Sequence, residues 1–283
     1  MDLATFELKI SRSENLPVLP EVVSAVLKMA DDPNAAPRTM QALIERDPSI
    51  TAKILRVASS PQYGLGSSSS ISRAISVLGM NTMRALVVGV AYQQLISFKQ
   101  CSRRLNRREF WRHSLATGTA GRILAKLKAP GLAEELYTVG MLHDVGILVI
   151  DKFCPDHLDE AIGFADRESI TLADACNHLY EWDHIAVGTL LAKKWGMGEA
   201  VCNSINYHLQ PHNDPDQRDL SYFLCAANYL ANECECGGGL KFVDRAPSEE
   251  VMERIGLPLE QYESIKAVVS AEVKKAETSF QMQ

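Results

Sequence analysis

Apolar residues recur at the three- and four-residue spacing of an amphipathic helix through most of the chain. One such stripe starts at Leu19 and ends where Asp31, Asp32 and Pro33 follow it. Asp47 and Pro48 supply a cap and a first-turn proline for another helix, and Gly79 ends a later stripe as a C-cap glycine would. The pattern therefore predicts helices over residues 19–30, 48–58, 71–78 and 81–91.

The same spacing continues in the second part of the chain, with polar breaks between the stripes. Residues 147–150 could form a short strand on their periodicity alone, but they have no partner strand. The sequence thus predicts an all-α protein, with further helices over residues 110–128, 133–150, 156–167, 171–180, 183–195, 198–209, 220–232, 247–255 and 259–277.

The sharpest change of charge lies between Lys99 and Arg112, where six of fourteen residues are basic. We interpret this segment as a solvated connection between helices; a patch for phosphate or an acidic partner is the alternative. It divides the predicted fold into two packed helical subdomains, over residues 1–98 and 99–232. Residues 233–283 are expected to add a loop and helices that pack on this core.

Composition and charge argue against membrane, secreted and nucleic-acid-binding proteins. Hydrophobic residues make up 46% of the chain and charged residues 23%, as in ordinary globular proteins. The longest uncharged apolar run, 85–92, is far shorter than the ~20 residues of a membrane helix, and the first residues lack the apolar stretch of a signal peptide. We therefore expect a cytoplasmic protein with no membrane partner, and the net charge of −6 disfavours nucleic acid.

The cysteines do not form a recognisable framework. They number seven, are scattered, and are expected to be reduced thiols. Only Cys234 and Cys236 are close together, and we interpret them as part of a loop rather than as a zinc site because no second pair accompanies them.

Four histidines and an aspartate could carry chemistry. Adjacent His143 and Asp144 can reach one metal where a helix ends or bends, and histidines from neighbouring helices can join them inside a bundle. Imidazole and carboxylate together suit iron, manganese or zinc, and such a metal would activate water and polarise a phosphoryl oxygen. Each histidine taken alone is more typical of a hydrogen-bonded core or surface residue. The candidate ligands are His113, His143, Asp144, His184 and His208.

Several motifs stand in an order that resembles HDOD domains, the HD-related output domains of bacteria. The resemblance runs from about Leu16 to His212 and more faintly to the last helix, and it implies a multi-helix fold like that of HD domains. Its motifs are Leu16-Pro17-Val18-Leu19-Pro20, Glu45-Arg46-Asp47-Pro48, Ile54-Leu55-Arg56-Val57-Ala58, Ala74-Ile75-Ser76-Val77-Leu78-Gly79, Phe110-Trp111-Arg112-His113-Ser114, Val139-Gly140-Met141-Leu142-His143-Asp144-Val145-Gly146, His184-Ile185-Ala186-Val187-Gly188 with Trp195, and Tyr207-His208.

The resemblance also implies roles for these residues. The HD superfamily is similar to metal phosphohydrolases, which would make His113, His143 and Asp144 metal ligands, with His143 and Asp144 catalytic if the site is active. His184 and His208 fall on the additional histidines of that family. The distal aspartate is replaced by Asn228, a weak ligand, because a neutral amide oxygen binds a divalent metal less strongly than a carboxylate.

Two functions remain open from the sequence. The first is a signal-transduction or regulatory protein with a degenerate metal site that acts through signalling partners or a bound ligand. The second is a metal-dependent phosphohydrolase acting on a nucleotide or another phosphoester; oxygenase chemistry at a two-iron site would draw on the same histidines. A divalent metal (iron, manganese or zinc) is expected in the enzyme, whereas the first function suits either a bound metal without turnover or a hydrogen-bonded His143-Asp144 pair with no metal. Trp111, Trp182 and Trp195 are interpreted as core or interface aromatics, with nucleotide stacking as the alternative.

Overall fold

The computed structural model describes residues 3–12, 21–29, 36–60, 63–65, 70–96, 101–216, 218–234, 246–258 and 261–280. Within these ranges the regular structure is helical and contains no strand, which confirms the predicted all-α class. Several sequence predictions fall outside the described residues, namely those on Leu16–Pro20, Asp31–Pro33, Lys99 and Cys236.

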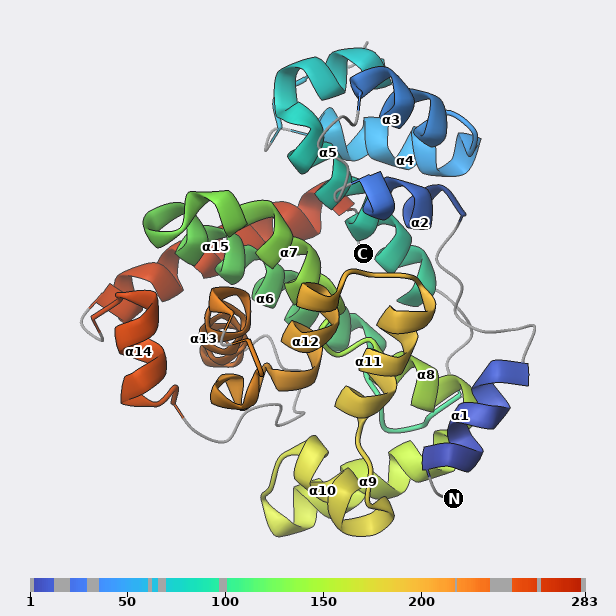
Figure 1. Ribbon diagram of the computed structural model, residues 1–283, viewed down its shortest axis with the longest axis vertical. Helices are drawn as coiled ribbons and strands as arrows, with labels where there is room; N and C mark the ends of the chain where they lie inside the picture. The colour runs from blue at the N-terminus through green and yellow to red at the C-terminus, as the bar shows by residue number, and fades with distance from the viewer. Residues whose placement is uncertain are drawn as a thin grey trace.

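A terminal lobe is formed by α2 (Glu21–Lys28), α3 (Pro37–Ile44), α4 (Pro48–Ala58) and the first part of α5 (Ile71–Ile96), at the top of Figure 1. The predicted cap of α4 is confirmed, because the Asp47 carboxylate accepts hydrogen bonds from the backbone N–H groups of Ser49 and Ile50 at 2.9 and 3.0 Å. Pro48 occupies the first turn, where its missing N–H costs no helical hydrogen bond.

Helix α5 is bent at Gly79, the residue at which the sequence predicts a helix end. Gly79 has φ 81° and ψ 163°, outside the helical region and readily adopted only by glycine. The whole of α5 is long and apolar enough to span a membrane by length and composition, but its most apolar part is 56% buried within the protein. Most apolar residues after the bend, among them Val87, Val90 and Ala91, are core residues, whereas Val77 before it is 62% exposed.

The larger body is built around α6 (Arg107–Lys128), which packs most extensively on α7 (Ala133–Leu142) and α13 (Asp219–Glu233). Helix α1 (Leu3–Arg12) also lies against this body, because Phe6 stacks on Trp182 with ring centroids 5.0 Å apart. The remaining helices are α8 (Gly146–Phe153), α9 (Pro155–Glu168), α10 (Leu172–Tyr180), α11 (His184–Lys194), α12 (Glu199–Tyr207), α14 (Glu249–Ile255) and α15 (Tyr262–Phe280), with short 3-10 turns at Pro130–Leu132 and Pro211–Asn213.

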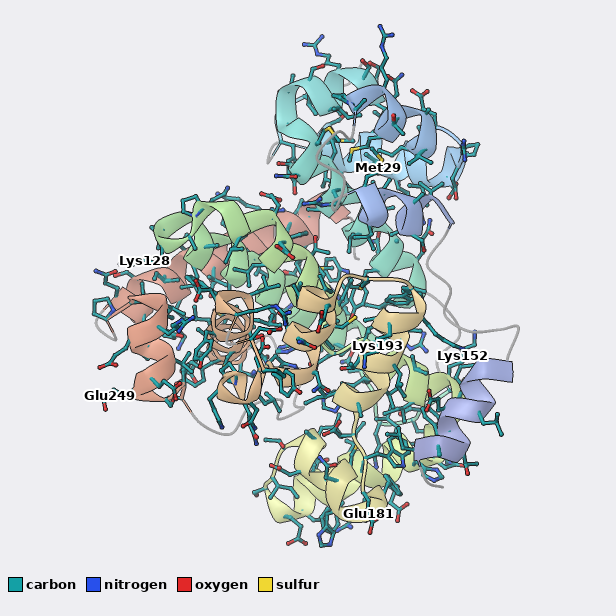
Figure 2. The ribbon with its side chains drawn as sticks, in the orientation of Figure 1. Met29, Lys128, Lys152, Glu181, Lys193 and Glu249 are labelled. Atoms are coloured by element: carbon teal, nitrogen blue, oxygen red, sulfur yellow. The ribbon has the colours of Figure 1, made fainter. Side chains whose placement is uncertain are left out.

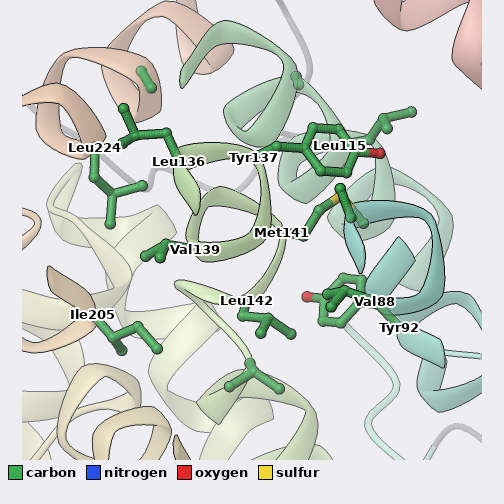
Figure 3. Close-up of a cluster of buried hydrophobic side chains, with 14 of the residues drawn as sticks. Val88, Tyr92, Leu115, Leu136, Tyr137, Val139, Met141, Leu142, Ile205 and Leu224 are labelled. Atoms are coloured by element: carbon green, nitrogen blue, oxygen red, sulfur yellow. The ribbon is translucent and has the colours of Figure 1, made fainter. Parts of the chain in front are cut away.

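Helix α7 lies in the middle of the core. Figure 3 shows its Leu136, Val139 and Leu142 between side chains of α12 and α13 on one side and of α5 and α6 on the other. Charged side chains such as Lys128 and Glu249 project from the periphery (Figure 2). Trp111 is fully buried and Trp182 and Trp195 nearly so, which agrees with their interpretation as core aromatics.

The helix predicted over residues 133–150 is wrong as a single element. It divides into α7 and α8, which are joined by tight turns at residues 143–145. In these turns Val145, Ile147 and Leu148 each donate a backbone hydrogen bond to the residue three positions earlier, at 3.0 to 3.1 Å. Such i→i+3 bonds redirect the chain. Residues 147–150, considered as a strand, lie in α8.

Several basic side chains of the basic segment pair with acidic side chains of the protein. Arg107 is buried and donates to the Asp151 carboxylate through Nε at 2.9 Å. Arg112 forms an ion pair with Glu277 at 2.6 Å, and Arg104 lies 3.9 Å from Asp166. These pairings agree with a connection between helices and leave less of a patch for an external phosphate.

Candidate metal centre

His143 and Asp144 lie at the bend between α7 and α8. This is the position at a helix end from which adjacent histidine and aspartate side chains were predicted to reach one metal. Because the chain turns sharply there, two adjacent side chains face the same point in the interior. His143, Asp144 and the neighbouring His113 place one ligand atom each within 4.8 Å of one another. All three are fully buried.

Four imidazoles surround the carboxylate of Asp144. On Oδ2, the Nε2 atoms of His143 and His113 lie at 3.0 and 3.6 Å. On Oδ1, the Nε2 atoms of His184 and His208 lie at 3.2 and 3.7 Å. The structure therefore brings together all five candidate ligands from four separate segments of the chain.

Each histidine comes from a different helix or helix end. His113 lies on α6, and His208 follows α12 as its C-cap residue. His184 is the first residue of α11, where the Asp183 carboxylate caps the helix by accepting from the N–H of Ala186 at 2.9 Å. The cap fixes the start of α11, and with it the direction of His184.

Hydrogen bonds define which ring nitrogen faces the carboxylate. Nδ1 of His143 lies 2.7 Å from the carbonyl oxygen of Gly140, and Nδ1 of His208 lies 2.7 Å from that of Ile205. A carbonyl can only accept, so both Nδ1 atoms carry the proton and donate it. In the neutral form of each ring, the Nε2 lone pair then points towards Asp144. This arrangement, with N–H bound to a backbone carbonyl, is the usual outer support of a metal-bound histidine.

The cluster also contains polar atoms without a well-aligned partner. Nε2 of His143 and both carboxylate oxygens of Asp144 are buried and make no hydrogen bond of ordinary geometry. Buried polar groups are normally satisfied, because desolvation without a partner costs about 1–3 kcal/mol. A cation among these atoms would satisfy them.

Burial and mutual contacts separate the ionisation states. Burial, together with nearby His143, lowers the pKa of His113 to about 3 and that of His208 to about 4. For His184, burial lowers the pKa, but contact with Asp144 outweighs it and raises the pKa to about 10. Burial raises the pKa of Asp144, but contacts with His143 and His184 hold it well below its usual value. Asp144 is thus an anion paired with His184, beside the neutral rings of His113 and His208.

Asn228 lies at the same cluster. It is 1% exposed on α13, and its side chain contacts His113, a contact that raises the histidine's pKa. The amide of Asn232, one turn further on, donates to the carbonyl oxygen of Asn228 at 2.9 Å. The position expected for a distal carboxylate is therefore near the other ligands and carries an amide.

Sequence reasoning missed two residues at the edge of the cluster. Tyr92 of α5 is fully buried and shares a hydrogen bond of 2.9 Å with the hydroxyl of Ser114, the residue after His113. Burial raises the pKa of Tyr92, and Asp144 raises it as well, so the phenol stays protonated beside the carboxylate. Tyr92 ends an apolar run of the sequence, and nothing in that run indicates that its hydroxyl makes a hydrogen bond to another helix.

The two acidic residues near His184 in the sequence, Asp183 and Glu181, differ in their contacts and exposure. The Asp183 carboxylate caps α11 and accepts a hydrogen bond from the side-chain amide of Asn177 at 2.7 Å. It still raises the pKa of His184. Glu181 is exposed, in a left-handed conformation at the end of α10. Both line a cavity of about 370 Å³ together with Asp174 and Tyr207.

The cluster itself is closed. The side chains of His113, His143, His184 and His208 are 0 to 3% exposed, and that of Asp144 is 1% exposed. A metal bound there would meet four imidazoles and a carboxylate, whereas catalytic metal sites usually keep a position open for water or substrate.

Comparison with known families places most of the chain in one family. The HDOD domain family matches residues 16–211, well over half of the chain. The chain belongs to the HDOD family. The resemblance predicted from the sequence motifs is thereby confirmed, and all four histidines and Asp144 lie within the matched residues of this HDOD protein, with Asn228 beyond them.

Solved structures share the fold over nearly the whole chain. An HDOD domain protein of unknown function from Geobacter sulfurreducens is 26% identical, with a TM-score of 0.82 over 98% of this chain and 97% of that one. A candidate phosphohydrolase of Shewanella amazonensis is 20% identical, with a TM-score of 0.75 over 98% of both chains. A candidate signal transduction protein of Marinobacter aquaeolei is 22% identical, with a TM-score of 0.77 over 98% of this chain and 60% of that one. At the identities of the last two, the likeness shows a common fold.

A curated relative also matches. A Treponema pallidum protein with no assigned function is 23% identical over 220 residues, which are 77% of the HDOD protein. The HDOD protein spans 42% of the length of that relative.

Proposed function

We propose that this chain is a cytoplasmic regulatory HDOD protein whose buried histidine and aspartate cluster holds a divalent metal as a fixed part of the fold, without turnover. One observation carries the metal part of the proposal. The backbone carbonyls of Gly140 and Ile205 force Nε2 of His143 and His208 to face the anionic carboxylate of Asp144. Two acceptors that face each other in a buried site repel, and a cation between them removes the repulsion.

The donor set fits such an ion. His113, His143 and Asp144 would hold it, with His184 and His208 completing the shell; His184 would first give up the proton that it shares with Asp144. Imidazole and carboxylate ligands suit iron, manganese and zinc. When bound in an open site, such a metal supplies a Lewis acid for water and phosphoryl groups. In this site the residues would mainly fix its geometry and exclude water.

Three features support the absence of turnover. The ligands are almost fully buried, and five protein donors leave little room for a substrate. Asn228 stands where a further carboxylate would strengthen the site. The cavity that borders Asp183 and Ile185, on either side of His184, is lined by the carboxylates of Asp174, Glu181 and Asp183, which would repel an anionic phosphoester.

The regulatory part of the proposal draws on the arrangement of the two parts of the molecule. A cavity of about 280 Å³ lies between Leu27 of the terminal lobe, Arg84 of α5 just after the bend, and Glu135, Met197 and Glu199 of the larger body. A ligand or a signalling protein that bound across this junction would change how the two parts meet. Input by this route needs no catalysis at the cluster.

The test is elemental analysis of the purified protein, prepared without chelators or a tag that removes metal. We expect close to one equivalent of iron, manganese or zinc, and a loss of at least about tenfold in bound metal for His143→Ala and Asp144→Ala. His178→Ala is the matched control, because His178 is an exposed histidine that stacks on Phe164. A wild-type protein without metal would contradict the metal part of the proposal.

The hydrolytic alternative is decided by a screen of phosphoesters and nucleotides with the metal-loaded protein. We expect no turnover above that of Asp144→Ala. Hydrolysis by the wild type that disappears in Asp144→Ala, but persists in His178→Ala, would replace the regulatory proposal with a phosphohydrolase.

A further inference from the structure

We propose that Gly146 and Gly188 are positioning residues, which set the distance between His184 and Asp144 by letting α8 and α11 touch through their backbones. The inference rests on the proposed metal centre and concerns residues that touch no metal themselves.

The contact between α8 and α11 leaves no space for a side chain at residue 146. A Cβ atom on Gly146 would lie 1.9 Å from the carbonyl oxygen of His184 and 2.6 Å from the backbone nitrogen of Gly188. These are backbone atoms, so no rotation of a side chain can relieve the overlap. Any larger residue at position 146 must move one helix away from the other.

Residue 188 is less restricted. A Cβ atom there would lie 3.3 Å from the nitrogen of Gly146 and 3.6 Å from Cγ2 of Ile205. The first distance requires a shift of a few tenths of an ångström, and the second is an ordinary contact. Position 188 therefore offers a milder change at the same helix contact.

The helix contact is directly coupled to the ligands. Gly146 opens α8 two residues after Asp144, and the atom that a Cβ on it would meet first is the carbonyl oxygen of His184 itself. Moving α8 from α11 must therefore lengthen the 3.2 Å separation between Asp144 Oδ1 and His184 Nε2. Glycine is otherwise a poor residue inside a helix, which makes a close backbone approach the physical reason for two of them at this point.

A second glycine contact works in the same way on the other side of the cluster. A Cβ atom on Gly140 of α7 would lie 2.6 Å from the Cα and nitrogen of Gly118 of α6. Gly118 lies on the helix of His113, and Gly140 supplies the carbonyl oxygen that binds Nδ1 of His143. The two contacts together allow α6, α7, α8 and α11 to approach one carboxylate.

The experiment compares Gly146→Ala, Gly188→Ala and Gly163→Ala. Gly163 of α9 is the control, because the atoms nearest to a Cβ there belong to the flexible side chain of Arg104, at 3.4 Å or more. Two quantities are measured for each folded variant: the His184 Nε2 to Asp144 Oδ1 distance in a crystal structure without metal, and the affinity for Zn²⁺ by titration.

We expect the distance to grow by about 1 Å in Gly146→Ala, with Zn²⁺ affinity at least about tenfold lower. Gly188→Ala should show smaller changes in the same direction, and Gly163→Ala none. An unchanged distance in Gly146→Ala would overturn the inference. If Gly146→Ala does not fold, Gly188→Ala decides in the same way.

The distance and the affinity separate the two proposals. Wild-type protein that binds no Zn²⁺ would contradict the proposed metal centre, while the distances would still test the positioning role. If the wild type binds Zn²⁺, and Gly188→Ala and Gly146→Ala keep the wild-type Zn²⁺ affinity and the wild-type His184–Asp144 distance, the positioning role alone is contradicted.

Discussion

Asp144 shows how strongly the surroundings of one side chain determine its chemistry. A buried carboxylate is costly unless positive charge or hydrogen bonds compensate for lost water. Here His184 supplies one positive charge, while His113 and His208 are held neutral by burial. The result is a site whose remaining lone pairs converge on one region of the interior.

Asn228 offers a way to change the metal affinity of the site by replacing one amide with a carboxylate. We expect Asn228→Asp to raise Zn²⁺ affinity by about tenfold or more, because it adds an anionic oxygen next to His113. The metal-free variant should be less stable than the wild type by about 1–3 kcal/mol, because a second carboxylate is buried near Asp144. Titration with Zn²⁺ and urea unfolding with and without metal measure both effects.

Asn232→Asp is the matched control for this substitution, because Asn232 lies one turn further along α13 and is less buried. It should leave Zn²⁺ affinity within about twofold of the wild type. Equal gains in both variants would show that general negative charge, rather than a new ligand, is responsible.

The family resemblance was enough to predict which side chains meet at the site, but not what surrounds them. The motifs that contain His113, His143 and His184 stand in a recognisable order, so the family resemblance placed them. Tyr92 reaches Ser114 from a different helix, and Gly146 reaches the carbonyl of His184. Such contacts depend on how helices cross, which local periodicity does not encode.

At the scale of elements, the ends of helices were predicted best where a side chain makes the cap. Asp47 and Asp183 bind the first N–H groups of α4 and α11, and both are polar residues ahead of an apolar stripe. The break between α7 and α8 was missed because no proline or polar cap marks it. Packing of α8 on α11 accompanies the change of direction there.

A second element-scale device is the loop before α6. The Asp159 carboxylate of α9 accepts hydrogen bonds from the Ser102 hydroxyl at 2.6 Å and from the backbone N–H groups of Arg103 and Arg104 at 3.0 and 2.9 Å. Burial raises the pKa of Asp159, but these hydrogen bonds outweigh it and lower the pKa below its usual value. The carboxylate thus holds the loop in its ionised form.

We expect Asp159→Ala to lower the free energy of unfolding by about 1–2 kcal/mol at pH 7, because three donors lose their acceptor. A carboxyl whose pKa is depressed on folding stabilises the protein above its unfolded pKa, and this contribution disappears as pH falls through the folded value. The difference from the wild type should be constant from pH 7 to about 5 and shrink below about 4. Urea unfolding at several pH values measures it.

Asp156→Ala provides the comparison, because Asp156 is exposed and lies 4.0 Å from Arg103. Its effect should stay within about 0.5 kcal/mol at every pH. A difference for Asp159→Ala that grows on acidification would contradict the role assigned to the carboxylate.

At the scale of the whole molecule, Arg107 joins the end of α5 to the larger body. Its guanidinium donates to the carbonyl oxygen of Ile96, the last residue of α5, at 3.0 Å and to the carboxylate of Asp151 on α8. Asp151 also accepts from the N–H of Ser102. This buried pair therefore connects the end of α5, the loop and the larger body at one point.

We expect Arg107→Met to destabilise the protein by about 3–5 kcal/mol, because Asp151 is left buried without its partner. Arg108→Met should change stability by less than about 0.5 kcal/mol, because Arg108 is exposed. Thermal unfolding followed by circular dichroism measures both. A loss in Arg107→Met no larger than that in Arg108→Met would contradict a joining role for the buried pair.

The architecture of the molecule was predictable in class and only partly in arrangement. Helical periodicity and the family motifs predict an all-α fold, and the structure confirms it. The boundary placed near residue 99 stays a prediction. Phe6 of α1 packs on Trp182, more than 170 residues along the chain, and nothing in the sequence near Phe6 indicates that partner.

The bend at Gly79 has a mechanical consequence for α5. Residues 71–78 belong to the terminal lobe, while Tyr92 lies beside the cluster, and the bend makes these two segments separate rods. The terminal lobe could therefore swing about Gly79 without dragging the phenol away from Ser114. Any conformational coupling between the lobe and the cluster would have to pass through the packed side chains of neighbouring helices, rather than along α5 as one continuous rigid helix.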